Sequence, residues 1–408
     1  MTEQKYKFLS TPRRPVEDRR FVAGRGKFIA DLDRPNMLHV APLASHYAAA
    51  VINGIDASAA LAMPGVVDVI TGAELAAAVQ PLMNGLNTPN VRRFPLAVDR
   101  VRYAGEWICA VVAESRALAE DALEKIIVDA TPQPFILDAE AALLDTSAPV
   151  HPEHGSNLLL DRKFVWGPVD DDFDAAAHSL SFSVTWGRNS TVPIETFGVL
   201  AEWNGWDQML DIWASIQMPK YADQIARSLD LPGNAIRVHY DVDVGGSYGV
   251  KRGIKHSVLV GYIARKLGCP VRLIEDRLEN MRAGDAHGPE RKFDITIAFD
   301  QDGTVRSMKM RALDNAGAYA GRAPFQLGKP ISAIVGPYQI NSVAYHALSV
   351  TTNKTVQEAV RGFGQAPTNY AIETAMDRVA EYLGMDRLAL RQKNLIREDQ
   401  FPYLIPSG

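Results

Sequence analysis

The segment Val244-Gly245-Gly246-Ser247-Tyr248-Gly249, the first glycine loop, constrains the fold of this chain more than any other feature. It follows a β-like run and leads into a helical pattern, as does a second glycine loop, Arg361-Gly362-Phe363-Gly364. Glycines at such a junction let backbone N–H groups approach an anion or cofactor without interference from a Cβ atom. Neither loop has the G-x-x-x-x-G-K-[ST] or G-x-G-x-x-G pattern of phosphate sites. The loops therefore predict a large cofactor held by backbone groups, with Tyr248 and Phe363 near a flat substrate.

Size and charge narrow the class of protein. At 408 residues the chain is long enough for two or three domains. A net charge of −5 argues against nucleic acid as the main partner. The first residues lack the apolar stretch of a signal peptide, and no apolar run approaches the roughly 20 residues of a membrane span. We therefore expect a cytoplasmic chain with no membrane span.

The two cysteines, Cys109 and Cys269, predict packed core thiols rather than reactive groups. Cys109 lies inside an apolar run, and Cys269 follows a helix-like segment. Because the sequence contains no C-x-x-C motif, we do not expect this chain to build an iron–sulfur cluster or a zinc site. Any redox relay would then lie on another chain.

Composition divides the chain into segments. Residues 1–18 are polar and proline-containing, which predicts an extended N-terminal arm. Residues 19–132 alternate strand and helix patterns, and residues 133–165, rich in proline, alanine and aspartate, predict a linker. Residues 166–408 form a second unit of mixed strands and helices, so the predicted fold class is α+β. From Arg397 onward the sequence is loop-like.

Hydrophobic periodicity places individual elements within these units. Ser115 is the expected N-cap of a helix that follows an apolar strand. A Gln301-Asp302-Gly303-Thr304 turn favours a hairpin. The patterns predict strands at 107–113 and 236–244, a hairpin joining 293–299 to 305–313, and a long helix over 366–383.

Taken one by one, the polar residues favour ordinary structural roles. His151 and His154 share the predicted linker, where solvated side chains are more common than a metal pair. Lys251 and Arg252 could meet an anionic substrate, but solvated surface charges are the commoner explanation. Arg361 could anchor a polar cofactor edge or form a structural salt bridge. No familiar catalytic grouping, such as G-x-S-x-G or H-E-x-x-H, is present.

An ordered set of motifs is far more specific than any one of these residues. The motifs are Gly24–Phe28, Met37–His39, Ala60–Val66, Val101–Glu106, Pro193–Thr196, Val244–Gly249, Asp314–Tyr319 and Ala359–Gly364. With this order, the chain from Arg19 onward resembles the large, molybdopterin-binding subunit of the molybdenum hydroxylases. The resemblance implies a hammerhead-like α/β domain over residues 19–132, followed by an incomplete molybdopterin-binding α+β domain over residues 166–408.

The resemblance also implies roles for individual residues. The implied cofactor-binding positions are Asn189, Gly245, Gly246, Ser247, Tyr248, Gly249, Arg361, Gly362 and Phe363, and the implied substrate positions are Tyr248, Arg252, Lys329 and Phe363. Asn189 falls where the family usually has a glutamine beside the metal. Arg252 replaces the substrate-binding glutamate of purine-oxidising members, which argues against xanthine and favours a carboxylated or hydroxylated ring. The second glycine loop lacks the cysteine that copper-containing carbon monoxide dehydrogenases need, so that activity is not expected.

Length is the largest departure from the family. Its large subunits continue for hundreds of residues past the Phe401–Tyr403 segment, and that remainder holds most dinucleotide contacts and the catalytic glutamate base. The resemblance thus implies the N-terminal half of a split subunit, as in nicotinate dehydrogenase, with a shortened chain as the alternative. We therefore expect neither the catalytic base nor a metal ligand on this chain.

The implied activity is hydroxylation of an electron-poor carbon in a small aromatic N-heterocycle, with oxygen derived from water. The implied cofactor is molybdopterin with molybdenum, in its cytosine dinucleotide form. The implied partners are a second molybdopterin-binding subunit, a [2Fe–2S] small subunit and an FAD-binding medium subunit. Two alternatives stay open: an aldehyde oxidoreductase subunit, and a non-catalytic binding or assembly protein that retains the fold.

Overall fold

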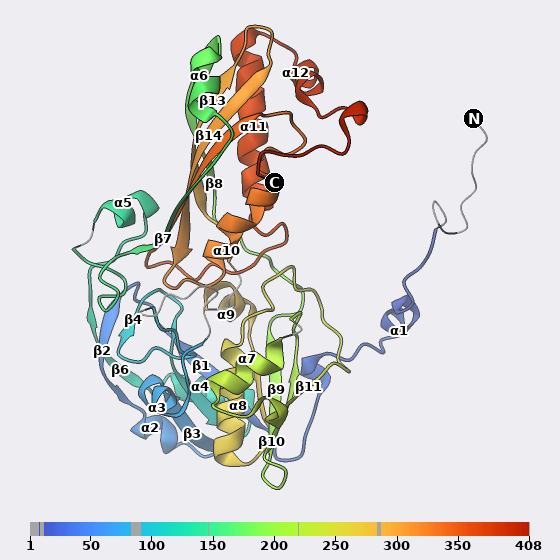
Figure 1. The fold of residues 1–408 in the computed structure, drawn as a ribbon. Helices are drawn as coiled ribbons and strands as arrows, with labels where there is room; N and C mark the ends of the chain where they lie inside the picture. The colour runs from blue at the N-terminus through green and yellow to red at the C-terminus, as the bar shows by residue number, and fades with distance from the viewer. Residues whose placement is uncertain are drawn as a thin grey trace.

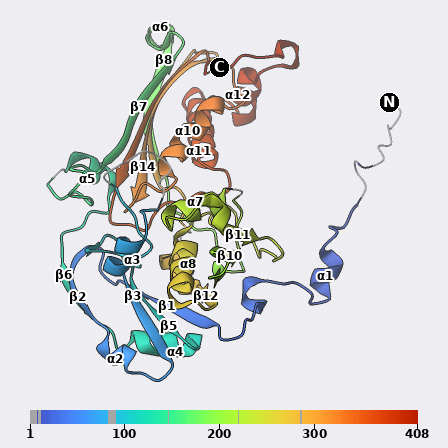
Figure 2. The same ribbon diagram turned by 60° about the horizontal axis from the view of Figure 1, so that its bottom comes forward.

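The computed structural model describes Phe8 and residues 12–82, 91–145, 147–218, 220–283 and 287–407, which form three β-sheets flanked by helices (Figures 1 and 2). The lower part of Figure 1 holds the seven-stranded and three-stranded sheets. The upper part holds the five-stranded sheet and the long helix α11 (Gln365–Leu383), while the segment with α1 (Asp18–Val22) extends away from the body. Among the described residues, no helix is both long and apolar enough to cross a membrane.

The seven-stranded sheet joins strands from both predicted units. Its order is β11 (Ile236–His239), β10 (Met209–Ala214), β9 (Gly198–Asn204), β12 (Val271–Ile274), β1 (Leu38–Ala44), β5 (Trp107–Ala113) and β3 (Val66–Thr71). The two units meet where β1 pairs in parallel with β12, with Leu38 opposite Val271. Helices α7 (Tyr221–Ser228) and α8 (Lys255–Leu267) contribute apolar side chains to the core beside this sheet. The units predicted as 19–132 and 166–408 therefore share one continuous sheet.

The first unit has the predicted α/β character. Its three-stranded sheet has the order β4 (Arg100–Val101), β2 (Ala50–Asp56) and β6 (Ile127–Pro132), and its helices are α2 (Ser58–Leu61), α3 (Gly72–Ala78) and α4 (Arg116–Leu123). The predicted cap of α4 is confirmed, because the Leu118 N–H donates to Ser115 Oγ at 3.2 Å. In β5, Cys109 is fully buried, and burial raises the pKa of its thiol to about 12, as expected for a core thiol. Cys269 is free and partly buried.

The five-stranded sheet forms the frame of the second unit. Its order is β7 (Leu158–Trp166), β15 (Ser342–Thr351), β14 (Val305–Gly317), β13 (Arg291–Phe299) and β8 (His178–Trp186). The predicted hairpin is the antiparallel pair β13–β14. Alternate side chains of these strands pack against α11 on one face, as the period-two geometry of a strand requires. The remaining helices are α5 (Ala139–Leu144), α6 (Val169–Ala175), α9 (Arg277–Arg282), α10 (Ala323–Gly328) and α12 (Arg387–Asn394), with 3₁₀ turns at Ile29–Asp31, Gly233–Ala235, Lys329–Ala333 and Glu398–Gln400.

The opposite face of the five-stranded sheet carries a cavity of about 570 Å³, which we call the sheet cavity. Its polar lining side chains include Lys163, Ser181, Ser183, Asp294, Thr296, Lys309, Arg311 and His346. Neither glycine loop contributes to its lining. The sheet cavity and the candidate site below are therefore separate features of the molecule.

Residues 133–165, predicted as a linker, are part of the fold. Helix α5 packs against β14 and β15, and β7 is an edge strand of the five-stranded sheet. His151 is fully buried, with Nε2 2.6 Å from the Ala318 carbonyl oxygen, so its prediction as a solvated side chain is wrong. Proline and alanine lower the local signal for regular structure, but packing against a neighbouring sheet overrides that weak preference.

Strand β11 ends at His239, five residues before the predicted end at Val244. Beyond it, the Asp241 carboxylate pairs with Lys27 Nζ at 2.7 Å. The Asp243 carboxylate accepts hydrogen bonds from the Arg20 guanidinium and from the Lys27 N–H. These contacts with the N-terminal segment take the place of sheet pairing and lead the chain into the first glycine loop.

Candidate functional site

The two glycine loops lie against each other. The Arg361 N–H donates to the Tyr248 carbonyl oxygen at 2.7 Å, which joins the second loop to the first. Gly249 has φ +114°, and a Cβ atom there would overlap the Ala359 carbonyl oxygen. Glycine is therefore required at this position by both its backbone angle and the close approach of the two loops.

The two aromatic residues of the loops share an unusual backbone conformation. Tyr248 has φ +53° and Phe363 has φ +34°, in the left-handed region that non-glycine residues rarely occupy. Such a conformation costs on the order of 1–3 kcal/mol and persists only where the surroundings impose it. The Tyr248 side chain is 48% exposed, so burial in the core does not explain its placement. Strained, partly exposed aromatics on adjoining loops favour a binding role for both rings.

Several backbone donors of the loops have no acceptor among the described residues. They are the N–H groups of Gly246, Ser247, Tyr248 and Gly362. Three of them are consecutive, and successive unpaired N–H groups in a turn form a concave cradle for negatively charged or oxo groups. A molybdenum cofactor brings oxo ligands and anionic phosphate, so the donors present fit that kind of group.

Neighbouring polar side chains hold the first loop in place through hydrogen bonds and an ion pair. The Glu195 carboxylate accepts a hydrogen bond from the Gly245 N–H at 2.8 Å and pairs with Lys251 Nζ at 2.6 Å. Burial lowers the pKa of Lys251, and the contact with Glu195 opposes that shift. The Lys251 side chain is only 1% exposed, so its prediction as a solvated surface charge is wrong. Gln217 Oε1 accepts hydrogen bonds from the Gly249 N–H, at 2.9 Å, and from the Ser247 hydroxyl.

Asn189 lies beyond the end of β8, and its backbone pairs with the segment that contains Gly288. Its carbonyl oxygen accepts a hydrogen bond from the Gly288 N–H at 2.8 Å. A Cβ at Gly288 would overlap Asn189 Oδ1, so the amide side chain lies directly over that glycine. Isolated β-bridges then connect Ser190 to His287 and His287 to Gln357. The segment that carries Asn189 thus forms a continuous patch with the approach to the second loop.

The cationic candidates differ in their surroundings. The Arg252 guanidinium has no hydrogen-bond or ion-pair partner in the described parts of the chain, and its Nε is buried. Burial lowers the pKa of Arg252, the Arg322 charge lowers it further, and Glu358 opposes the shift. Arg322 itself contacts the Met218 sulfur at 3.6 Å and a Glu358 carboxylate oxygen at 4.0 Å.

The other two cationic candidates are exposed. Lys329 lies in the 3₁₀ turn Lys329–Ala333, after α10. Arg361 also has an exposed side chain, and within the described residues it forms no ion pair that would make it a structural salt bridge. Its guanidinium is therefore accessible to a ligand, which is compatible with the prediction that Arg361 contacts a polar edge of the cofactor.

The residues that sequence reasoning missed are those that support the loops rather than form them. Glu195 lies within the Pro193–Thr196 motif, so a signal for it was present. Gln217 and Gly288 lie outside every motif, and only their contacts with Gly249 and Asn189 reveal them. Arg188, beside Asn189, belongs to the same group.

Comparison with known proteins identifies two domains in this chain. Residues 150–395 match the molybdopterin cofactor-binding domain, and residues 23–134 match the aldehyde oxidase and xanthine dehydrogenase a/b hammerhead domain. The nicotine 6-hydroxylase large subunit of Paenarthrobacter nicotinovorans is 32% identical over 404 residues, covering 96% of this chain and 49% of that protein. The 6-hydroxypseudooxynicotine dehydrogenase complex subunit gamma of the same organism is also 32% identical, over 396 residues, covering 95% of this chain and 49% of the relative.

Solved structures show the same relationship. The crystal structure of quinoline 2-oxidoreductase from Pseudomonas putida 86 superposes with a TM-score of 0.90 at 33% identity, covering 99% of this chain and 52% of that one. The chain thus spans about half the length of these three proteins. The matched domains, the fold and the paired glycine loops lead to one conclusion: this chain belongs to the molybdopterin cofactor-binding domain family and carries the hammerhead domain of the aldehyde oxidases and xanthine dehydrogenases.

Proposed function

We propose that this chain is the molybdopterin-binding part of a molybdenum hydroxylase that acts on an electron-poor carbon of a small aromatic N-heterocycle. The observation that carries the proposal is the backbone contact between the two glycine loops. These loops carry N–H groups without an acceptor among the described residues and two aromatic residues with positive φ. The proposed cofactor-binding residues are Asn189, Gly245, Gly246, Ser247, Tyr248, Gly249, Arg361, Gly362 and Phe363.

Each part of this surface has a distinct role in the proposal. When bound, the molybdenum cofactor supplies the oxygen-transfer and electron-accepting chemistry of the reaction. The unpaired N–H groups of the first loop hold anionic or oxo groups, and the Asn189 amide can donate a further hydrogen bond. The exposed Arg361 guanidinium suits an anionic edge of the cofactor. The cytosine dinucleotide form of that cofactor is part of the proposal.

The substrate class follows from the rings and cations beside the loops. Tyr248 and Phe363 would stack on a planar ring. Arg252 has no partner among the described residues, and the nearby Arg322 is only loosely paired with Glu358, so both can meet an electron-rich or anionic substituent. Lys329 would add a third positive charge. Two of the similar proteins reported above are named for nicotine and quinoline, which favours an N-heterocycle over an aldehyde.

This chain covers 49% of the nicotine 6-hydroxylase large subunit, so other polypeptide would supply the remaining parts of the enzyme. We propose that the glutamate base and most dinucleotide contacts come from polypeptide equivalent to the other half. A [2Fe–2S] subunit and an FAD-binding subunit would carry the electrons away, in a cytoplasmic complex.

The test begins with the assembled complex, purified through a tag on this chain from a host that makes molybdenum cofactor. Molybdenum and pterin are measured, co-purifying chains are identified by mass spectrometry, and turnover is assayed with nicotinate, hydroxypyridines, quinoline and aryl aldehydes. We expect about one molybdenum per chain and incorporation of ¹⁸O from labelled water into a hydroxylated heterocycle.

Other outcomes would replace the proposal. A complex without molybdenum would favour the non-catalytic binding or assembly protein. Turnover of aldehydes alone would favour the aldehyde oxidoreductase. Hydroxylation by the isolated chain would contradict a site completed by other polypeptide.

A further inference from the structure

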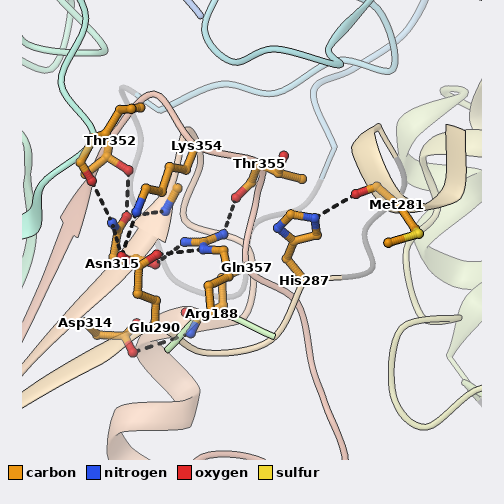
Figure 3. A network of polar contacts seen from close by, with 12 residues as sticks. Arg188, Met281, His287, Glu290, Asp314, Asn315, Thr352, Lys354, Thr355 and Gln357 are labelled. Atoms are coloured by element: carbon orange, nitrogen blue, oxygen red, sulfur yellow. Dashed lines mark hydrogen bonds and ion pairs between the residues drawn. The ribbon is translucent and has the colours of Figure 1, made fainter. Parts of the chain in front are cut away.

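Arg188 directly precedes Asn189, but the two side chains have different environments. Asn189 is exposed, whereas the Arg188 side chain is only 13% exposed and reaches into the fold. Figure 3 shows its guanidinium at the centre of a network of polar contacts. An arginine buried beside a candidate cofactor residue calls for an explanation, because burying an unpaired cation is costly.

The Arg188 guanidinium joins three separate segments of the chain. Nε donates to the Glu290 carboxylate at 2.8 Å, just before β13. Nη2 donates to the Asn315 carbonyl oxygen at 2.7 Å, in β14, and Nη1 donates to the Thr355 carbonyl oxygen at 2.5 Å. Three divergent donors from one planar group are a geometry that arginine supplies and lysine cannot.

The acceptors are themselves held in place. The Glu290 carboxylate also pairs with Lys354 Nζ at 2.7 Å, and Asn315 Oδ1 accepts a hydrogen bond from the Thr352 hydroxyl at 2.6 Å. Burial alone would raise the pKa of Glu290, but hydrogen bonds from Lys354 and Arg188 outweigh it and lower that pKa. Arg188 is thus fixed at both ends of its fork by groups that cannot easily move.

The Thr355 contact leads directly to the second glycine loop. Two residues on, Gln357 forms the bridge with His287, and the Glu358 N–H donates to the His287 carbonyl oxygen at 2.8 Å. Three residues further, the Arg361 N–H donates to the Tyr248 carbonyl oxygen. The Arg188 side chain therefore links the backbone next to Asn189 to Thr355, at the start of the segment whose Arg361 contacts the first loop.

We propose that Arg188 is a positioning residue, which fixes Asn189 relative to the two glycine loops without touching cofactor or substrate. The functional half of this inference rests on the proposed role of Asn189. The structural half, that Arg188 sets the contact between the loops, depends only on this chain.

The test replaces Arg188 with lysine, which keeps the charge and loses the fork. Hydrogen exchange is followed in peptides covering residues 355–363 of the purified complex. We expect the Arg361 amide to exchange about 10-fold faster in R188K, and kcat to fall by about 10-fold with little change in KM, a typical effect of losing an outer supporting contact. Molybdenum content should stay near that of the unmodified complex.

The matched control is R311K. Arg311 also makes several charged hydrogen bonds, to Glu140 and Asp294, and its side chain is likewise mostly buried, but it lines the sheet cavity. We expect no change in exchange at Arg361 or in turnover. If R188K exchanges like the unmodified protein, or if R311K speeds exchange equally, the positioning role is wrong.

A milder variant covers the case in which R188K does not fold. E290Q retains an oxygen that can accept from Arg188 but loses the ion pairs, and we expect a smaller increase in exchange at Arg361. Unchanged exchange in E290Q would contradict the proposal. If the complex contains no molybdenum, the proposed function fails while the exchange measurement still decides whether Arg188 sets the loop contact.

Discussion

The glycine-loop surface, formed by the two glycine loops and Arg252, differs from the sheet cavity in whether its polar groups have hydrogen-bond partners. In the sheet cavity the polar side chains satisfy one another: Arg311 binds Asp294 and Glu140, Ser183 donates to Asp294, and Lys309 pairs with Asp170. On the glycine-loop surface, consecutive N–H groups lack acceptors and the Arg252 guanidinium lacks a partner among the described residues. Open volume therefore does not locate the site; unsatisfied donors and strained backbone do, because both are costly unless a ligand uses them.

The substitution with the largest expected effect is Gly249→Ala, which tests the close approach of the two glycine loops. The added Cβ would overlap the Ala359 carbonyl oxygen at a φ of +114°, so the loops would have to separate. We expect a loss on the order of 4 kcal/mol in the free energy of unfolding, together with loss of bound molybdenum. Chemical denaturation and metal analysis measure the two effects. Gly54→Ala is the control, since a Cβ there meets nothing within 4 Å, and a loss as large as that of G249A would show that the close approach is unimportant.

Removing one cation from each region compares buried and exposed ion pairs. Lys251→Met leaves Glu195 without its buried partner, and we expect a loss of about 3 kcal/mol. Lys309→Met removes a pair with Asp170, whose side chain is 89% exposed, and we expect less than about 1 kcal/mol. Urea denaturation of both variants gives the difference. Equal losses of stability would mean that the buried Lys251–Glu195 pair contributes no more than the exposed Lys309–Asp170 pair.

Glu290→Gln tests the Arg188 network through pH. The pKa of Glu290 is lowered from its ordinary 4.5, so its charge stabilises the fold above that pH, and this contribution is lost as pH falls through the lowered value. We expect E290Q to be about 1–2 kcal/mol less stable than the unmodified protein at pH 7, with the gap closing below pH 4.5. Thermal unfolding from pH 7 to 3 measures the gap. If the stability difference between E290Q and the unmodified protein stays constant across this range, the charge of Glu290 is not the cause of the loss.

The smallest effect on stability is expected from Tyr248→Asn, because asparagine tolerates the left-handed conformation better than tyrosine. We expect a gain within about 1 kcal/mol, accompanied by a higher KM for aromatic substrates. The control is Tyr240→Asn, an exposed tyrosine that is not in the left-handed region. A lower KM, or a loss of stability larger than in Y240N, would contradict a strained, substrate-facing ring.

Sequence patterns predicted the local elements well where the signal was local. The cap at Ser115, the β13–β14 hairpin and α11 follow from residues within one or two turns of each other. The predicted linker failed because α5 and β7 depend on a sheet whose other strands lie far along the chain. The prediction that Lys251 is a solvated surface charge was wrong for the same reason, because its partner Glu195 is 56 residues away.

The amino-acid sequence by itself determined that this chain has two glycine loops, each with an aromatic residue, and that they occur in the motif order of a molybdenum hydroxylase. Backbone freedom at glycine and the order of short motifs are properties of the chain alone. Only the tertiary structure decided that the loops touch through Arg361 and Tyr248, that both aromatics adopt positive φ, and that Glu195, Gln217 and Arg188 hold the surface together. These are contacts between segments 30 to 167 residues apart, and such contacts depend on packing that no local pattern records.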